Sequence, residues 1–275
     1  MSPEILLAAP VMLPLLGAAV ALLTRHRAGL QLIVTIGTLS VNLVIAALLM
    51  YWINENSILV LQIGKWTPTL GIVLVADRLT GLMLLVSSFV TLAVLIYASA
   101  QTISEHIEST PIAIFHPSYL LLVAGVSNAF LAGDLFNMYV GFEILLAASF
   151  VLLTLGGSAS RVRAATTYVI VSMVSSMLFL VGIASCYAAV GTVNLAEIAA
   201  RMDHVDHHLR LLIEFVLLIA FGLKAAIFPL SAWLPDSYPT APAPVTAVFA
   251  GLLTKVGIYA IIRLETLMFP ESEIS

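Results

Sequence analysis

The sequence is poor in charge and in cysteine. Only 9% of its 275 residues are Asp, Glu, Lys or Arg, whereas soluble globular domains carry about 25%. This shortfall excludes a soluble fold of this length. The single cysteine, Cys186, excludes an internal disulfide bond and an iron–sulfur cluster held by several thiolates. The net charge of -4 offers no basic excess for nucleic acid, so we expect no nucleic-acid partner.

Long hydrophobic runs take the place of the missing charge. Hydrophobic residues make up 61% of the chain, and its mean hydropathy is +1.10. A helix needs about 20 apolar residues to cross a bilayer, and apolar length with polar flanks identifies eight such runs. They are residues 5–23, 30–52, 77–99, 118–133, 135–155, 164–190, 209–229 and 243–264. The sequence therefore predicts an all-α polytopic membrane protein, a single domain over residues 1–275, in the lipid bilayer of the cell (inner) membrane.

The segment between the second and third runs departs from the helical pattern. Two runs rich in Val, Ile and Leu flank Gly64, Lys65, Thr67 and Pro68, which is the pattern of two short strands joined by a turn. We therefore predict a short β-hairpin at the membrane surface. The alternative is a ninth, broken span, and Lys65 and Pro68 argue against it because they interrupt the run.

Three ionisable side chains lie inside the hydrophobic runs: Glu143, Lys224 and Lys255. A charged side chain near the centre of a bilayer costs about 2.5–3.5 kcal/mol on insertion scales, and intramembrane charge marks ion and proton pathways. A helix that only filled space would use Leu or Ala at these positions. We therefore expect these three residues to carry the function, as a proton relay.

Lys224 is followed by a predicted helix break. Pro229 has no N–H, so the carbonyl of Ala225 loses its helical partner. The seventh run is therefore predicted to be a broken helix, as in transporters whose interrupted helices line an ion site. A lysine buried beside such a break can take up and release a proton. The alternative is a lysine that extends to the membrane surface, because Lys224 lies in the last third of its run.

Glu143 is the natural partner for one of the two lysines, because a nearby carboxylate favours the protonated amine. A pair that opens and closes would switch proton uptake, and the alternative is a permanent salt bridge that fixes helix packing. Lys255 lies near the centre of the eighth run. Gly251 and Gly257 beside it permit close helix approach or leave room for water, and a structural ion pair is the alternative for this lysine.

Histidines give weaker signals. His116, at the start of the fourth run, has the chemistry of a group through which protons enter, with a capping or interfacial role as the alternative. The run DHVDHH at 203–208 resembles metal ligands, but it stands without further ligand residues, so we expect a solvated loop. No haem or iron–sulfur ligand set is visible, and we expect neither a cofactor nor a bound metal.

Three segments around these residues are recognisable. They are GDLFNMYVGFEILL, RVRAATTYVIVSMVSSMLFLVGIASCYAAVGTVNLAEIA and FGLKAAIFPLSAWLPDSYPTAPAPVTAVFAGLLTKVGIYA. They closely resemble the proton-translocating, antiporter-like subunits shared by respiratory complex I and the Mrp cation/proton antiporters. The resemblance extends over essentially the whole chain. The motif around Glu143, with GDLFN before it and LGG after it, is most similar to the D-type subunits of the Mrp antiporters.

The resemblance implies a role for each matching position. Glu143 matches the family's glutamate of span five, which pairs with the lysine of span seven, and Lys224 matches that lysine. Lys255 matches the lysine of span eight, which passes the proton along the polar axis. The resemblance also implies the other subunits of an antiporter complex as partners, and H⁺ with Na⁺ as the transported ions.

The family pattern continues beyond span eight into a second, inverted repeat that this sequence does not contain. The resemblance therefore implies N-terminal helices 1–3 in residues 1–100 and the first five-helix repeat in residues 118–264. We expect the N-terminal portion of a sodium/proton antiporter subunit, which is a transporter and not an enzyme. The alternatives are a proton-pumping membrane subunit of an NADH–quinone oxidoreductase or hydrogenase complex, and a truncated remnant that does not transport.

Overall fold

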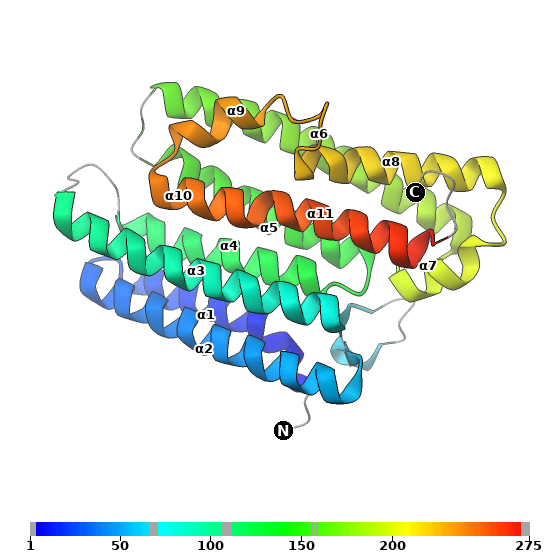
Figure 1. The fold of residues 1–275 in the computed structure, drawn as a ribbon, viewed down its shortest axis with the longest axis horizontal. Helices are drawn as coiled ribbons and strands as arrows, with labels where there is room; N and C mark the ends of the chain where they lie inside the picture. Colours follow the sequence, from blue (N-terminus) through cyan, green and yellow to red (C-terminus); the bar gives the residue numbers. More distant parts are fainter. Residues whose placement is uncertain (1–3, 67–70, 106–111, 156, 158, 271–275) are drawn as a thin grey trace.

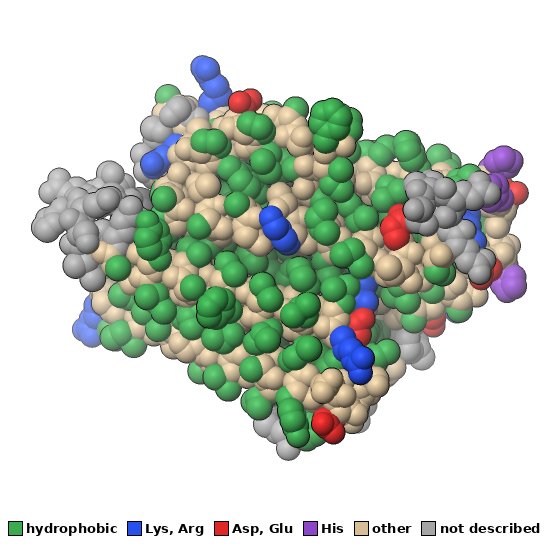
Figure 2. Space-filling view, in the orientation of Figure 1, with side chains coloured by type: hydrophobic (Ala, Val, Ile, Leu, Met, Phe, Trp, Pro, Cys, Tyr) green, Lys and Arg blue, Asp and Glu red, His purple; other side chains and the backbone are tan. Residues whose placement is uncertain are grey.

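The computed structural model describes residues 4–66, 71–105, 112–155, 157 and 159–270. They form a bundle of long, roughly aligned helices with one small hairpin (Figure 1). Seven helices in these ranges are long and apolar enough to cross a membrane. Hydrophobic side chains cover the middle of the face seen in Figure 2, and most of its charged side chains lie near the two ends. The predicted all-α, multi-pass membrane fold is confirmed.

The N-terminal helices surround one central helix. A 3₁₀ turn, η1 (Ile5–Ala8), leads into α1 (Ala9–Leu23), and α2 (Ala28–Asn56), α3 (Arg78–Glu105) and α4 (Ile112–Leu131) follow. α1 packs against α2 and α4, and α2 packs against α3. α4 is the most enclosed of the candidate spans, with 83% of its apolar window buried. The bundle is therefore built around α4.

α4 begins earlier than the predicted residue 118 because Pro117 does not end it. A proline inside a helix leaves the carbonyl four residues earlier without its N–H donor. Here that carbonyl belongs to Ala113, and it accepts a hydrogen bond from Gln31 Nε2 on α2 at 3.1 Å. The helix therefore tolerates the proline, and His116 lies inside α4 instead of at its start.

The predicted hairpin is confirmed. Strand β1 (Leu59–Gln62) pairs antiparallel with β2 (Val73–Ala76), with a 3₁₀ turn, η2 (Ile63–Lys65), after β1. Thr67 and Pro68 lie outside the described residues. The hairpin packs against the turn between α4 and α5 because the N–H of Gly133 donates to the Val73 carbonyl at 2.8 Å. A Cβ on Gly133 would lie 2.6 Å from Val75 Cγ2, so only glycine allows this approach.

The next helices form the second part of the bundle. They are α5 (Leu135–Thr154), α6 (Ala159–Val190), α7 (Leu195–Met202) and α8 (His207–Ala225), with the short α9 (Leu234–Ser237) and 3₁₀ turn η3 (Tyr238–Thr240) after them. α5 packs between α4 and α6, and α6 packs against α8. Asp134 caps α5 by accepting the Asn137 N–H at 2.7 Å, which fixes the tight turn from α4.

The predicted seventh span corresponds to α8 and is broken, as expected. It ends at Ala225 instead of 229, because Ala226 adopts the left-handed conformation, with φ 53° and ψ 47°. A left-handed residue closes a helix before any proline is reached. α8 is not among the seven apolar candidate spans, and its 19 residues include Arg210, Glu214 and Lys224.

The last span is helical throughout but changes its pitch twice. α10 (Ala243–Val248) continues through a π-helical turn, η4 (Phe249–Leu253), into α11 (Thr254–Arg263) and a second π-helical turn, η5 (Leu264–Met268). α11 packs against α8. The division of the chain into helices 1–3 and a five-helix repeat over 118–264 stays a prediction.

Candidate proton-relay site

Three helices meet at the level of Glu143. Phe142 on α5, Phe179 on α6 and Phe221 on α8 are fully buried and pack together, with ring centroids 4.8–6.2 Å apart. Such aromatic pairs add about 0.5–1.5 kcal/mol each beyond their buried area. The cluster therefore holds the three helices at a fixed spacing, with Glu143 next to Phe142 and Lys224 one turn after Phe221.

α6 and α8 approach closely on the same level. The hydroxyl of Ser175 donates to the Ala220 carbonyl at 2.7 Å. A Cβ on Gly182 would lie 2.4 Å from Leu217 Cδ2, so Gly182 leaves room for this leucine side chain where α6 meets α8. These contacts between α6 and α8 place Lys224 relative to α6 without involving its charge.

Glu143 is half-buried and has a polar partner on α6. Ser176 Oγ donates to Glu143 Oε1 at 2.5 Å. On the same helix, Tyr168 shares a 2.7 Å hydrogen bond with Ser149 of α5. Polar side chains thus follow the contact between α5 and α6 from Glu143 towards the end of α5. A serine hydroxyl both donates and accepts hydrogen bonds, so it can form a link in a hydrogen-bonded chain that leads to a carboxylate.

Lys224 is also half-buried. Its Nζ lies 5.6 Å from the centroid of the Phe142 ring, in cation–π geometry. Glu143 directly follows Phe142 in α5, but the described side chains of Lys224 and Glu143 form no ion pair. The lysine is therefore beside its predicted carboxylate partner, with the aromatic ring in place of a salt bridge.

The break after Lys224 is stabilised by specific donors. The N–H of Ile227 donates to the Gly222 carbonyl at 3.1 Å, and Trp233 Nε1 donates to the Leu223 carbonyl at 3.2 Å. Irregular backbone inside a membrane protein needs such partners. The chain leaves the helix two residues after Lys224 and returns to cover its end, so the lysine lies at an interrupted helix as predicted.

Lys255 lies in different surroundings. It is exposed on the surface of this chain, and its Nζ donates to the Ala250 carbonyl at 2.6 Å and to Thr254 Oγ1 at 3.2 Å. Ala250 belongs to the π-helical turn η4, and π turns are frequent at functional sites. No carboxylate contacts Lys255 among the described side chains.

The two lysines are connected by a close helix crossing. A Cβ on Gly257 would lie 2.5 Å from the Ala225 nitrogen, so the backbones of α11 and α8 touch there. Gly257 stands two residues after Lys255, and Ala225 directly follows Lys224. The small residue beside Lys255 permits close helix approach, as the sequence predicted.

His116 is separate from this group. It is 6% exposed and lies in the bundle of α1 to α4, and its Nδ1 is buried with no hydrogen-bond partner in the part of the chain that the structure describes. The loop at 203–208 has structural roles, because Asp206 caps α8 and Asp203 pairs with Arg210 at 3.1 Å. No group of three metal-ligating side chains occurs among the described residues.

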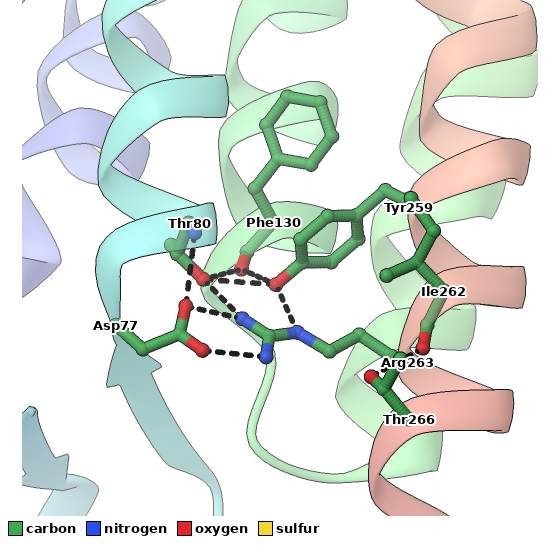
Figure 3. Close-up of polar contacts among 7 residues, drawn as sticks. All are labelled: Asp77, Thr80, Phe130, Tyr259, Ile262, Arg263 and Thr266. Atoms are coloured by element: carbon green, nitrogen blue, oxygen red, sulfur yellow. Dashed lines mark hydrogen bonds and ion pairs between the residues drawn. The ribbon is translucent and has the colours of Figure 1, made fainter.

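One polar cluster was missed by the sequence analysis. Arg263 on α11 makes a bidentate contact with Asp77, before α3, at 2.6 and 2.5 Å (Figure 3). The Arg263 Nη2 also donates to Thr80 Oγ1 at 2.8 Å, and its Nε donates to the Tyr259 hydroxyl at 3.0 Å. Tyr259 in turn donates to the Phe130 carbonyl of α4 at 2.6 Å. We call these five residues the Arg263 clamp.

Glu214 was also missed. It lies in α8, is 1% exposed, and its Oε1 has no hydrogen-bond partner among the described residues. The signal available in the sequence was its place in the same hydrophobic run as Lys224. For the Arg263 clamp no local signal exists, because Asp77 and Arg263 stand 186 residues apart.

Comparisons with known proteins agree with this arrangement. The family described as "NADH:quinone oxidoreductase/Mrp antiporter, TM" matches residues 132–275. The chain is 40% identical over 262 residues to the D-type subunit of the Na(+)/H(+) antiporter of Alkalihalophilus pseudofirmus, covering 94% of this chain and 52% of that protein. It is 46% identical over 215 residues to the D-type subunit of a probable K(+)/H(+) antiporter of Rhizobium meliloti, covering 76% of this chain and 38% of that protein.

Two solved structures share the fold. A chain of the Mrp complex from Dietzia sp. DQ12-45-1b superimposes with a TM-score of 0.89 at 33% identity, over 98% of this chain and 50% of that one. A chain of the membrane-bound sulfane sulfur reductase, an archaeal respiratory complex, superimposes with a TM-score of 0.84 at 25% identity. The match covers 94% of this chain and 52% of that one. The chain thus spans about half the length of the relatives it matches. With its interrupted helix, its intramembrane lysine and its match over 132–275, the chain belongs to the NADH:quinone oxidoreductase/Mrp antiporter transmembrane family, in which it is a homologue of the Mrp D-type subunits.

Proposed function

We propose that this chain is the N-terminal, proton-translocating portion of the D-type subunit of a multisubunit monovalent cation (Na⁺)/H⁺ antiporter. In this role it is a transporter subunit that works with the other subunits of the complex. Lys224 carries the proton, Glu143 modulates it, and Lys255 is the next relay. The observation that carries the proposal is the half-buried Lys224 at an interrupted helix, beside Glu143 and, within the described part of the chain, without an ion pair to it.

The geometry supports a switch and not a permanent bridge. Each charge has another partner: Lys224 lies over the Phe142 ring, and Glu143 accepts from Ser176. A lysine that is not locked to a carboxylate can change its protonation state, and approach of the carboxylate favours the charged amine. Closing and opening of the Glu143–Lys224 contact would therefore load and release a proton.

The position of Lys255 supports the next step. Its amine is held by a carbonyl of the π turn and by Thr254, and both are weak partners compared with a carboxylate. The contact of Gly257 with Ala225 brings the two lysine-bearing helices together. Protons released at Lys224 would pass to Lys255 beside this contact, where the two helices are held together.

The test is sodium-driven proton transport in vesicles that contain the assembled antiporter complex. We expect Lys224→Ala to abolish flux while the protein still inserts. Leu212→Ala is the matched control, because Leu212 lies on the same helix and is 59% exposed. Unchanged flux in Lys224→Ala would reject the carrier role, and equal loss in both variants would indicate damage to α8 instead.

A second candidate is a proton-pumping membrane subunit of an NADH–quinone oxidoreductase or hydrogenase complex. The similarity to a respiratory membrane complex favours it. In that case proton movement would require electron transfer in a partner subunit and not a sodium gradient. Purification of the native complex distinguishes the two, because it would bring down either antiporter subunits or redox subunits. If the chain co-purifies with neither antiporter nor redox subunits and shows no proton flux, it is a truncated remnant that does not transport.

A further inference from the structure

The bundle of α1 to α4 has a polar interior away from Glu143 and Lys224. On α2, Gln31, Thr35, Thr38 and Asn42 are between 0 and 9% exposed. Their spacing of four, three and four residues places them on one helix face. Residues on the outer face of the same helix, such as Ile33, are exposed and apolar. α2 therefore turns a polar stripe inward and an apolar surface outward.

A second polar wall faces this stripe. The Tyr119 hydroxyl on α4 donates to the Thr91 carbonyl on α3 at 2.7 Å. His116 lies one turn before Tyr119, and Ser88 one turn before Thr91. All four side chains are at least nine-tenths buried. These residues form a row along α4 and α3, on the side that α2 faces.

Hydrogen bonds join the two walls at both ends. At one end, Gln31 Nε2 donates to the Ala113 carbonyl at 3.1 Å and to the Ala21 carbonyl at 2.8 Å. At the other end, Asn42 Nδ2 donates to Ser88 Oγ at 3.2 Å. The buried polar side chains between these two ends lie inside the bundle. We name this polar interior the polar seam, lined by Gln31, Thr35, Thr38, Asn42, Ser88, Thr91, His116 and Tyr119.

Three buried polar atoms in the polar seam have no partner among the described residues. Gln31 Oε1, Asn42 Oδ1 and His116 Nδ1 are buried and make no hydrogen bond within the described part of the chain. A buried polar atom without a partner costs about 1–3 kcal/mol. The two amide oxygens accept hydrogen bonds, and the imidazole nitrogen donates or accepts one according to its tautomer. The seam therefore calls for small molecules that form hydrogen bonds.

The chemistry of the lining selects water and not a cation. None of the eight lining residues is acidic, and a buried cation without a carboxylate would remain uncompensated. Buried water satisfies polar groups that the protein leaves unpaired, with about three hydrogen bonds each. Successive lining residues stand about one helical turn apart, near 5–6 Å, which a single bridging water can span.

We propose that the polar seam binds a row of ordered water molecules that connects His116 with Asn42, the midpoint of α2. The row satisfies the three unpaired atoms and gives His116 a hydrogen-bonded connection to the centre of the bundle. This connection does not pass through Glu143. It does not depend on the proposed antiport, because it follows from the lining residues alone.

X-ray hydroxyl-radical footprinting of the protein in lipid nanodiscs tests this directly. Radicals form from water at the site, so a buried side chain is oxidised only where water lies beside it. Tyr119 and Tyr259 are a matched pair, at 1% and 2% exposure, but Tyr259 is held by the Arg263 clamp. We expect Tyr119 to be oxidised several-fold faster than Tyr259. Equal protection of both tyrosines would overturn the proposal.

Two variants confirm the source of the water. Gln31→Leu and Asn42→Leu remove the acceptors, and each should slow oxidation of Tyr119 towards the rate of Tyr259. Leu39→Ala is the control, because Leu39 is fully buried on α2 but apolar, so its removal should not lower the rate. Fast oxidation of Tyr119 that persists in both leucine variants would show that the unpaired acceptors do not hold the water.

Discussion

Lys224 and Glu143 each interact with a third residue and not with one another. The lysine lies over the Phe142 ring, and the carboxylate accepts from Ser176. The two partners keep both charges in place when the direct contact is open. Phe142 and Glu143 are consecutive residues of α5, so a movement of the long lysine side chain from the ring towards the carboxylate would exchange one partner for the other. We interpret this arrangement as the open form of the proposed switch.

Glu143→Gln tests the switch at this scale. The amide keeps an acceptor oxygen for Ser176 but removes the negative charge that favours the charged amine. The lysine would then hold its proton only at lower pH, so we expect weaker flux and a pH optimum shifted towards acid. The measurement is sodium-driven proton flux in vesicles across a pH series.

The control for this variant is Glu197→Gln. Glu197 pairs with Arg201 on α7 at 3.4 Å, away from the lysines, so its loss should leave the pH optimum in place. A pH optimum that stays fixed in Glu143→Gln would count against the switch, whatever the change in total flux.

At the scale of helices, the Arg263 clamp ties the last span to the start of α3 and the end of α4. Burial raises the pKa of Asp77, but the hydrogen bonds from Arg263 and Thr80 outweigh it and lower the pKa to about 2. An ordinary aspartate has a pKa of about 3.9. The clamp therefore stabilises the fold fully above pH 4, and this contribution is lost as the pH falls towards 2.

Asp77→Asn should lower the free energy of unfolding by about 1.5–3 kcal/mol, the value of a hydrogen bond to a charged group. Arg263→Lys should cost less, because it keeps the charge and loses only the bidentate geometry. The measurement is thermal unfolding in detergent. The stability of the wild type should fall more steeply than that of Asp77→Asn between pH 4 and 2. Parallel curves would show that the clamp carries no charge-dependent stability.

The crossing of α8 and α11 gives a second test. Gly257→Ala places a Cβ 2.5 Å from the Ala225 nitrogen, and overpacking of this kind costs about 1–3 kcal/mol. Gly251→Ala, in the same span, meets only Val90 Cγ1 at 3.4 Å and should be tolerated. We expect Gly257→Ala to lower both melting temperature and flux. Equal behaviour of the two variants would mean that the close crossing is not needed.

Much of the helix arrangement could be predicted, because the lengths of the hydrophobic runs indicate where the helices lie. A short polar interruption between two apolar runs indicates the hairpin. The end of α8 could not, since Ala226 adopts a left-handed conformation that alanine does not signal. The Arg263 clamp could not either, because its residues meet only after α3, α4 and α11 have packed. Of the predicted site, the presence of a helix break after Lys224 follows from the sequence, but its position at Ala226 does not. The small residues beside Lys255 were compatible with a close crossing, and the cation–π contact with Phe142 had no signal.

At the scale of the whole molecule, the charges of the proposed relay are not equally enclosed. Lys224 and Glu143 lie between packed helices, whereas Lys255 is on the surface of this chain. The chain spans about half the length of its relatives. If the proton passes on from Lys255, it does so at a surface of this portion. We therefore expect flux to require the assembled complex.

The most direct test of the central claim is sodium-driven proton flux in Lys224→Arg, measured in the assembled complex beside Lys224→Ala. Arginine keeps the positive charge and its contact with the Phe142 ring, but it does not release its proton in proteins. If Lys224 carries the proton, both variants lose flux. If Lys224→Arg retains flux while Lys224→Ala does not, the residue supplies only a fixed charge, and the account is contradicted.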